Sequence, residues 1–251
     1  MKNYITLIGI MLLTGCSLNK GVDRAFFTEE TAISTDYTKP HQELAATASS
    51  VDDYVNAIKI LQPLYQQGKE ARVALQLAEN YLKLGDLINA EFYYMQATKN
   101  DKTQVAAWVG MGKVALQNGN AHKAMNHFAQ ALKIDDNNYK ALNGMAVSLD
   151  SLGKYQHARN YYRKLLAKNS NDKQVYNNLA VSYLLQGQYH EAEEILRQLI
   201  ASRVYPKNAL YNLAIVYSLS GQTQKLHELM QVIPDKVYFN RQLAKLKNSL
   251  R

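Results

Sequence analysis

Hydrophobic and small residues recur along this chain at a fixed spacing, and glycine marks the period. Five glycines follow one another at intervals of 34 residues: Gly85, Gly119, Gly153, Gly187 and Gly221. Seven residues before each glycine comes a small residue, and nine residues after it comes a large aromatic or aliphatic one. Spacings of three, four and seven place the apolar positions on one face of a helix. The pattern therefore predicts two amphipathic helices per unit, joined by a turn at the glycine.

The residues around each glycine also predict how the two helices pack. A glycine fits the left-handed conformation that closes a helix, which costs a residue with a Cβ about 1–2 kcal/mol. Five residues after it, four units have alanine and the fifth has Leu226. Small residues let helix backbones approach closely, and we expect the large residue to fill the gap toward the next unit. Enlarging Ala158 or Ala192 should overpack that contact, at roughly 1–3 kcal/mol.

The period of 34 residues and the residues at these positions resemble the tetratricopeptide repeat. The segment Val175–Leu199, VYNNLAVSYLLQGQYHEAEEILRQL, is similar to the repeat signature at nearly every position, and Trp108 with Gly112 is a second match. The proline common near the end of such repeats is replaced in this chain by Lys102, Asp136, Ser170 and Val204. The resemblance implies an all-α fold, a right-handed superhelical solenoid of helix-turn-helix units whose first helices line a concave groove.

The same pattern divides most of the chain into segments. We expect a degenerate N-terminal repeat over residues 41–70, five tetratricopeptide repeats over 71–233 and a C-terminal capping helix over 234–251. In the degenerate repeat, Pro63 falls inside an amphipathic pattern and should kink or shorten the helix. The capping helix has apolar residues at helical spacing and bases on its other face, which suits the open end of a repeat stack.

The beginning of the chain has the features of an export signal. Lys2 precedes the apolar run Ile5–Leu13, which is too short for a permanent span of about 20 apolar residues. The four residues that end in Cys16, Leu-Thr-Gly-Cys, resemble the bacterial lipoprotein box. We therefore expect a signal peptide over residues 1–15, a lipid anchor on Cys16 and a flexible tether over 16–40.

This resemblance also implies a location. Because Ser17 rather than Asp follows the cysteine, it implies sorting to the outer membrane, facing the periplasm, by a rule that varies between bacterial lineages. Cys16 is the only cysteine, so an intramolecular disulfide is excluded.

Charge and motif content limit the partners and reactions that the sequence supports. The formal net charge is +8, and residues 234–251 carry five bases against Asp235. This basic end is either a solvated helix face or a contact for anionic lipid or an acidic partner. Nucleic acid is an improbable partner, because export separates the chain from it and no aromatic residues interleave the bases. His190-Glu191 and His227-Glu228 begin like a zinc-protease motif, but each lacks the second histidine. We expect no enzymatic activity, cofactor or metal site.

The remaining candidate site is the groove. We expect its lining to be the first-helix residues of the last three repeats that packing does not use: Asn143, Asn177, Asn178, Tyr211 and Asn212, beside the aliphatic strip Val147, Val181 and Ile215. Asparagine amides donate to and accept from a peptide backbone, and the strip suits the apolar face of a bound helix. The other interpretation is packing between repeats without a ligand.

The chain as a whole resembles the TadD-like tetratricopeptide lipoproteins of the Tad (Flp) pilus assembly apparatus. Asn208–Gly221, NALYNLAIVYSLSG, carries the closest local similarity. The resemblance implies an outer-membrane adaptor, similar to a pilotin, that helps a pilus secretin to assemble or localise. The alternatives are a scaffold for cell-wall hydrolases and a type IV pilus pilotin. The sequence does not determine the oligomeric state.

Overall fold

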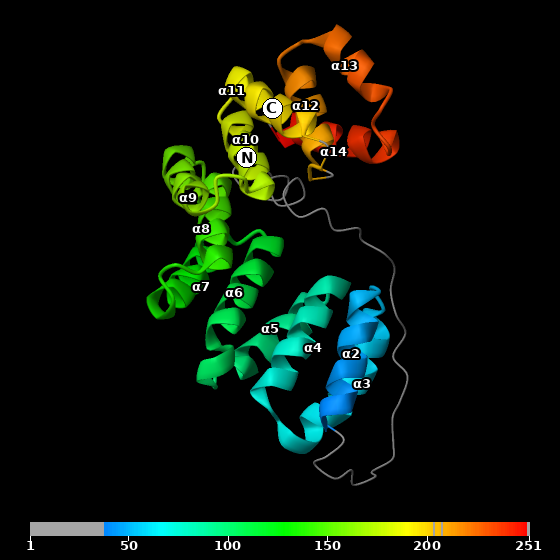
Figure 1. Cartoon of the computed structure of the whole chain (residues 1–251), viewed down its shortest axis with the longest axis vertical. Helices are drawn as coiled ribbons and strands as arrows, with labels where there is room; N and C mark the ends of the chain where they lie inside the picture. The colour runs from blue at the N-terminus through cyan, green and yellow to red at the C-terminus, as the bar shows by residue number, and fades with distance from the viewer. Residues whose placement is uncertain (1–37, 203, 207, 250–251) are drawn as a thin grey trace. The chain divides into compact units, whose positions relative to one another are not determined.

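The structure is a computed structural model that describes residues 38–249, except residues 203 and 207. Within this range the chain forms thirteen α-helices and no strand, which confirms the all-α prediction (Figure 1). The described helices form two compact units, residues 38–114 and residues 115–249, and the boundary falls inside α6 (Asp101–Gln117). The expected signal peptide, Cys16 and most of the expected tether lie outside the described residues.

The N-terminal unit consists of helices that pack on their neighbours in sequence. Before α6 these helices are α2 (Thr38–Ser50), α3 (Tyr54–Gly68), α4 (Ala71–Leu84) and α5 (Leu87–Ala97). Each of α2, α3 and α4 contacts the helix that follows it. Their shared core includes Leu61, Leu77, Ala78 and Ala90, all buried. Burial of this apolar surface is the main force that holds the helices together.

Two details of this unit differ from the sequence prediction. Helix α2 begins at Thr38, so the end of the predicted tether is helical. Pro40 lies in its first turn, where the N–H that proline lacks has no partner within the helix in any case. Pro63 does not shorten α3, which continues to Gly68; the other predicted effect, a kink at Pro63, stays a prediction. Pro63 is exposed, so water can bond the carbonyl oxygen that the proline leaves without an amide partner.

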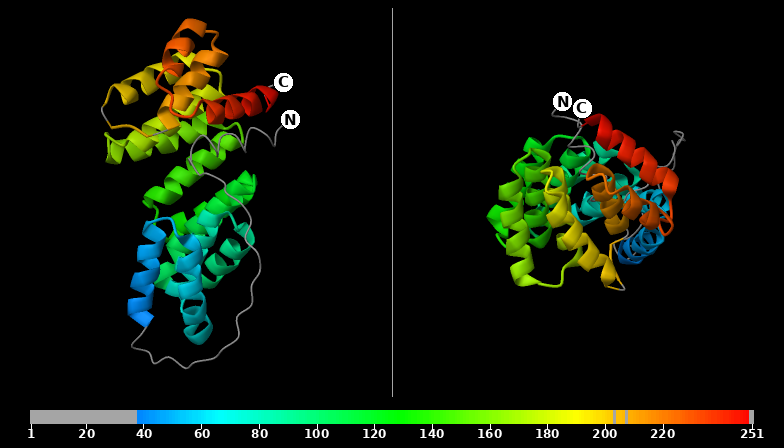
Figure 2. Two further views of the ribbon diagram at one scale, coloured as in Figure 1. Left: turned by 90° about the vertical axis from the view of Figure 1, so that its right-hand side faces the viewer. Right: turned by 90° about the horizontal axis from the view of Figure 1, so that it is seen from above.

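The C-terminal unit continues the alternation of first and second helices. Its helices are α7 (Ala121–Ile134), α8 (Tyr139–Ser151), α9 (Tyr155–Lys168), α10 (Lys173–Leu185), α11 (Tyr189–Ala201), α12 (Asn208–Leu219), α13 (Thr223–Met230) and α14 (Lys236–Ser249). Each helix from α7 to α12 contacts its successor, and α10 also contacts α8 and α12, the first helices of the adjacent repeats. Helix α14, red in Figure 2, packs Phe239 into the core of α10–α13.

The periodic glycines end the first helices, as the sequence predicts. All five have a positive φ, between 72° and 81°. At Gly85 the next amide, that of Asp86, donates to the carbonyl of Tyr81 at 3.0 Å and closes the last turn of α4. The second helices then begin with short polar caps in two repeats, where Asp86 and Asn120 accept a hydrogen bond from the backbone three residues later.

In the first two repeats, the large residue nine positions after the glycine packs against the next repeat. A Cβ added to Gly110 would lie 2.1 Å from the Tyr94 ring, and one added to Gly144 would lie 2.3 Å from the Phe128 ring. Both rings are buried. Gly110 and Gly144 each lie nine residues before the next periodic glycine. The residue at this position therefore contacts the large residue of the preceding repeat.

Candidate functional site

The eight predicted groove residues all lie on the first helices α8, α10 and α12 of the C-terminal unit. Asn143 and Tyr211 are half-buried. The other six are buried: Asn177, Asn178, Asn212, Val147, Val181 and Ile215. The aliphatic residues that we expected to form an open strip are therefore packed between helices. Asn178 and Asn212 occupy the same repeat position as Gly110 and Gly144, which explains why they are enclosed.

The asparagines form hydrogen bonds from one repeat to the next. Asn178 Nδ2 donates to Asn143 Oδ1 at 3.0 Å, which joins α10 to α8. Asn212 Nδ2 donates to Asn177 Oδ1 at 2.9 Å, which joins α12 to α10. The sequence identified these residues as amides suited to hydrogen bonding. In the structure they bond to each other, as the packing interpretation expects. Their contact with a partner stays a prediction.

The Asn177–Asn212 pair does not use all of its hydrogen-bonding capacity. Asn177 Nδ2 and Asn212 Oδ1 are buried and have no hydrogen-bond partner among the described residues. Two amides joined by one hydrogen bond always leave one NH₂ group and one carbonyl oxygen, whichever way the two side chains are flipped. A buried polar atom without a partner costs about 1–3 kcal/mol. The pair thus leaves one donor and one acceptor without partners, the same two kinds of group that a peptide bond carries.

A buried acidic network joins the same helices, α8 and α10, and was missed by the sequence analysis. Asp150, at the end of α8, accepts hydrogen bonds from Ser182 Oγ at 2.6 Å and Tyr162 Oη at 2.9 Å. Burial raises the pKa of Asp150 to about 7, although these hydrogen bonds and the charge of Arg159 lower it. The signal in the sequence was its position three before Gly153, where the first, second and fourth repeats have leucine.

Arg159 extends this network into the next repeat. Its side chain is 1% exposed, its Nη2 donates to Gln186 Oε1 at 2.6 Å, and its guanidinium lies 4.5 Å from the centre of the Tyr183 ring. The burial of an arginine on α9 against α10 ties the two repeats together by charge, hydrogen bonding and ring stacking. We assign the network a structural role, because Asp150, Arg159, Tyr162 and Ser182 are all buried and bond one another or a neighbouring repeat.

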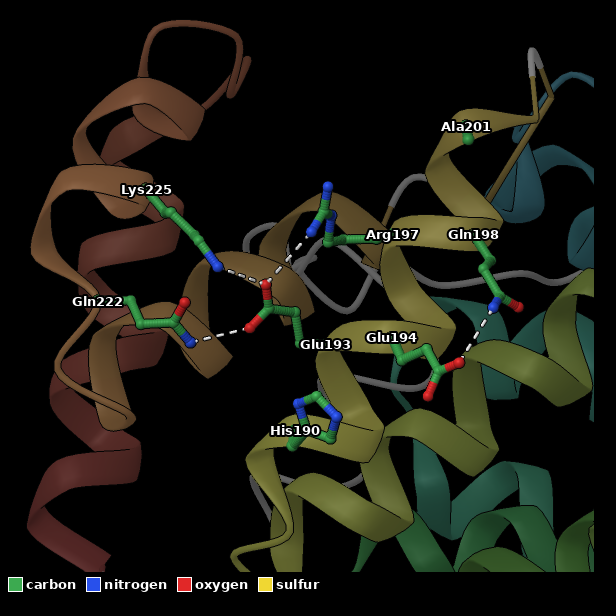
Figure 3. Close-up of a pocket in the computed structure, with 8 residues that line it drawn as sticks. All are labelled: His190, Glu193, Glu194, Arg197, Gln198, Ala201, Gln222 and Lys225. Atoms are coloured by element: carbon green, nitrogen blue, oxygen red, sulfur yellow. Dashed lines mark hydrogen bonds and ion pairs between the residues drawn. The ribbon is translucent and has the colours of Figure 1, made fainter.

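A hollow of about 680 Å³ lies between α11 and α13, lined by the residues drawn in Figure 3. Glu193 at its centre accepts from Lys225 Nζ at 2.8 Å and from Gln222 Nε2 at 2.9 Å, and Arg197 Nη1 is 3.8 Å away. Burial alone would raise the pKa of Glu193, but the hydrogen bonds from Lys225 and Gln222 bring it below its usual value. The carboxylate is thus occupied in joining two repeats.

Neither a metal-ligand cluster nor a membrane-spanning helix is found in the described part of the chain. Between residues 38 and 249, with the two gaps, no three His, Cys, Asp or Glu side chains gather as metal ligands. Over the same residues, no helix combines the length and apolar character that crossing a bilayer requires.

Comparison with known proteins identifies the repeats. A family profile described as tetratricopeptide repeat matches residues 26–232. No curated protein matches the sequence.

Among solved structures, a tetratricopeptide repeat protein from Parabacteroides merdae is 14% identical, with 82% of each chain covered and a TM-score of 0.70. PilW, a widely conserved type IV pilus biogenesis factor, is 18% identical over 85% of this chain and 99% of its own, with a TM-score of 0.70. PilF of Pseudomonas aeruginosa is 12% identical over 84% and 98%, with a TM-score of 0.63. Because the identities are low, these likenesses show that the chain shares the fold of these proteins and nothing beyond it.

Proposed function

The chain belongs to the tetratricopeptide repeat family, and on this premise we propose that it is a lipid-anchored adaptor that binds a segment of a partner protein in the bacterial envelope. The partner that we propose is the secretin of a Tad (Flp) pilus apparatus, whose assembly or localisation the adaptor assists. Cys16 carries the lipid, and the chain faces the periplasm from the outer membrane.

The observation that carries this proposal is the unmatched amide pair of Asn177 and Asn212. Its free NH₂ group and free carbonyl oxygen match the acceptor and the donor of a peptide backbone. Both atoms are buried, so a partner reaches them after the groups that cover them move aside. Burying these atoms without a partner destabilises the chain, and a peptide that bonds them removes this cost. Asn143 on α8 and Tyr211 on α12 are half-buried and flank the pair. The Tyr211 ring also meets the Tyr238 ring of α14.

Two further observations support the envelope location and the pilus. The sequence up to Cys16 has the features of a lipoprotein signal, and several acyl chains hold a protein stably at a bilayer. PilW, which shares the fold over nearly its whole length, is a type IV pilus biogenesis factor. That likeness also favours the second candidate, a pilotin of a type IV pilus.

The amide pair is tested by replacing both asparagines with leucine, which has nearly the same shape. Removing both members of a buried polar pair is close to neutral for stability, whereas removing one is costly. We expect N177L/N212L to melt at or above the wild-type temperature and to lose capture of the secretin from detergent-solubilised envelopes. The control Q156A/R163A changes two exposed residues of α9 and should retain capture.

The identity of the captured protein separates the candidates. A Tad secretin supports the first proposal and a type IV pilus secretin the second. Capture of a peptidoglycan hydrolase in place of either contradicts both and favours a cell-wall scaffold. Undiminished secretin capture by a folded N177L/N212L variant contradicts the assignment of the binding site.

The anchor is tested separately by feeding cells labelled palmitate. We expect label in the wild-type chain and none in C16S, with the C16S variant released from the membrane fraction. Unlabelled wild-type chain contradicts the anchor without bearing on the groove.

A further inference from the structure

Helix α14 has a concentration of positive charge without acidic residues. From residue 236 to residue 251 the sequence contains no Asp or Glu and five bases: Lys236, Arg241, Lys245, Lys247 and Arg251. Lys236 and Arg241 are exposed. On the helical period, position 247 follows position 236 along one row and position 245 follows position 241 along another. The four of these positions that lie within α14 therefore fall in two rows along the helix.

Between these rows lies a narrow apolar strip. Val237 and Ala244 are seven residues apart, which is two helical turns, and both are exposed; Val237 is 70% exposed. No neighbouring helix covers Val237, so it is accessible between the two rows of bases. The strip and its bases together form what we call the basic face of α14, defined by Lys236, Val237, Arg241 and Ala244.

The orientation of α14 is fixed by its opposite side. Phe239 is 2% exposed in the core, and Leu243 packs against the same core. The Tyr238 ring meets the Tyr211 ring of α12 edge to face, with 5.3 Å between centroids. The backbone amide of Tyr238 also donates to Asp235 Oδ1 at 2.8 Å, which caps the start of the helix. Because this side packs against the rest of the unit, the basic face points outward.

We infer that the basic face of α14 docks on an anionic phospholipid bilayer. The strip suits the boundary between headgroups and acyl chains, while the long basic side chains reach out to the phosphates. Each lysine or arginine close to an anionic surface strengthens binding. The inference goes beyond the partner-binding function. It rests on the proposed lipid anchor only in that the anchor keeps a bilayer within reach and raises its effective concentration.

The test uses the full chain with C16S, which removes the anchor, and vesicles of phosphatidylcholine with or without phosphatidylglycerol. Cys16 is the only cysteine, so C16S/V237C carries one thiol for an environment-sensitive dye. A second dye position, C16S/I88C, lies on α5 and is also exposed. Two charge variants lose the same charge: K236Q/R241Q on the basic face, and K133Q/K140Q at exposed sites elsewhere in the same unit.

We expect vesicles that contain phosphatidylglycerol to bind the C16S chain more tightly than neutral vesicles, with a difference that falls as salt rises. K236Q/R241Q should weaken that binding about 25-fold, or about fivefold per base, whereas K133Q/K140Q should leave it nearly unchanged. Dye at position 237 should report a less polar environment on these vesicles, and dye at position 88 should not.

Three results overturn the inference. Equal weakening by both charge variants means that net charge alone drives binding, and an unchanged signal at position 237 means that the face does not contact lipid. Absence of binding to anionic vesicles does the same and leaves an acidic protein as the occupant. None of these results bears on partner capture, because every variant keeps Asn177 and Asn212.

Discussion

At the scale of single residues, contact between a large side chain and a small one sets the distance between repeats. Tyr94 rests on Gly110 and Phe128 rests on Gly144, each pair sixteen residues apart in sequence. Any side chain at the glycine would need the space that the ring occupies. Interiors pack at crystal density, so such a clash moves helices instead of being absorbed locally.

Gly110→Ala should therefore destabilise the protein by about 1–3 kcal/mol or more, because its methyl group meets the Tyr94 ring. Urea unfolding measures the change. Gly68→Ala is the matched control in the same unit, since its new Cβ would lie 3.4 Å from the nearest side-chain atom. Adding Tyr94→Leu should restore part of the loss. A Gly110→Ala variant as stable as Gly68→Ala would contradict this account of the interface.

Asp150 predicts a pH dependence of stability. Burial raises its pKa to about 7 from the ordinary 3.8, so the folded chain holds a proton that the unfolded chain releases. The stability from this group is complete below about pH 4 and is lost as pH rises through 7. Between pH 5 and pH 8 the loss should be about 2–3 kcal/mol.

Asp150→Asn, which cannot ionise, should remove that part of the pH dependence and leave the part due to other groups. Urea unfolding of both proteins at the two pH values measures the difference. Identical pH profiles would show that Asp150 is ionised in the folded protein throughout this range.

The sequence predicted the helix face of these residues but not all of their contacts. It predicted that Tyr94 and Phe128 face the next repeat, but it assigned the position they rest on, occupied later by Asn178 and Asn212, to the groove. A spacing pattern gives the face of a helix and not the partner across an interface. Comparing large and small residues sixteen apart would have revealed the contact. Asp150 was missed because a lone acid among apolar positions has no motif.

At the scale of elements, the caps decide where each helix ends. The sequence predicted the glycine turns because only a residue without Cβ adopts a positive φ without strain. It did not predict that Lys69 ends α3 in the same conformation, with φ of 48°. The start of α2 was also missed, since Pro40 was interpreted as the end of a tether and not as a first-turn residue.

Lys69→Gly and Gly85→Ala should have opposite effects. Glycine at position 69 removes the cost of the left-handed conformation, and we expect a gain of about 1 kcal/mol in unfolding free energy. Alanine at position 85 meets no atom within 4 Å, so its expected loss of about 1 kcal/mol comes from the backbone alone. Thermal unfolding of the two variants measures both. A loss for Lys69→Gly would mean that its side chain stabilises α3 more than its backbone strains it.

At the scale of the whole molecule, side-chain bonds link successive repeats of the C-terminal unit. Hydrogen bonds between Asn143 and Asn178 and between Asn177 and Asn212 hold consecutive first helices together. The Asp150 and Glu193 clusters join further elements of the same unit. These bonds fix the positions of the asparagine side chains along the first helices of the unit.

The central claim, that a partner polypeptide binds along the first helices of the C-terminal unit, is tested most directly by photo-crosslinking in living cells. A photoreactive amino acid is placed at Asn143 or Tyr211, both half-buried on that surface, and at Arg163 on a second helix as the control. We predict crosslinks to a pilus secretin from positions 143 and 211 and none from position 163. Equal crosslinking from all three positions, or crosslinks from position 163 alone, would contradict the claim.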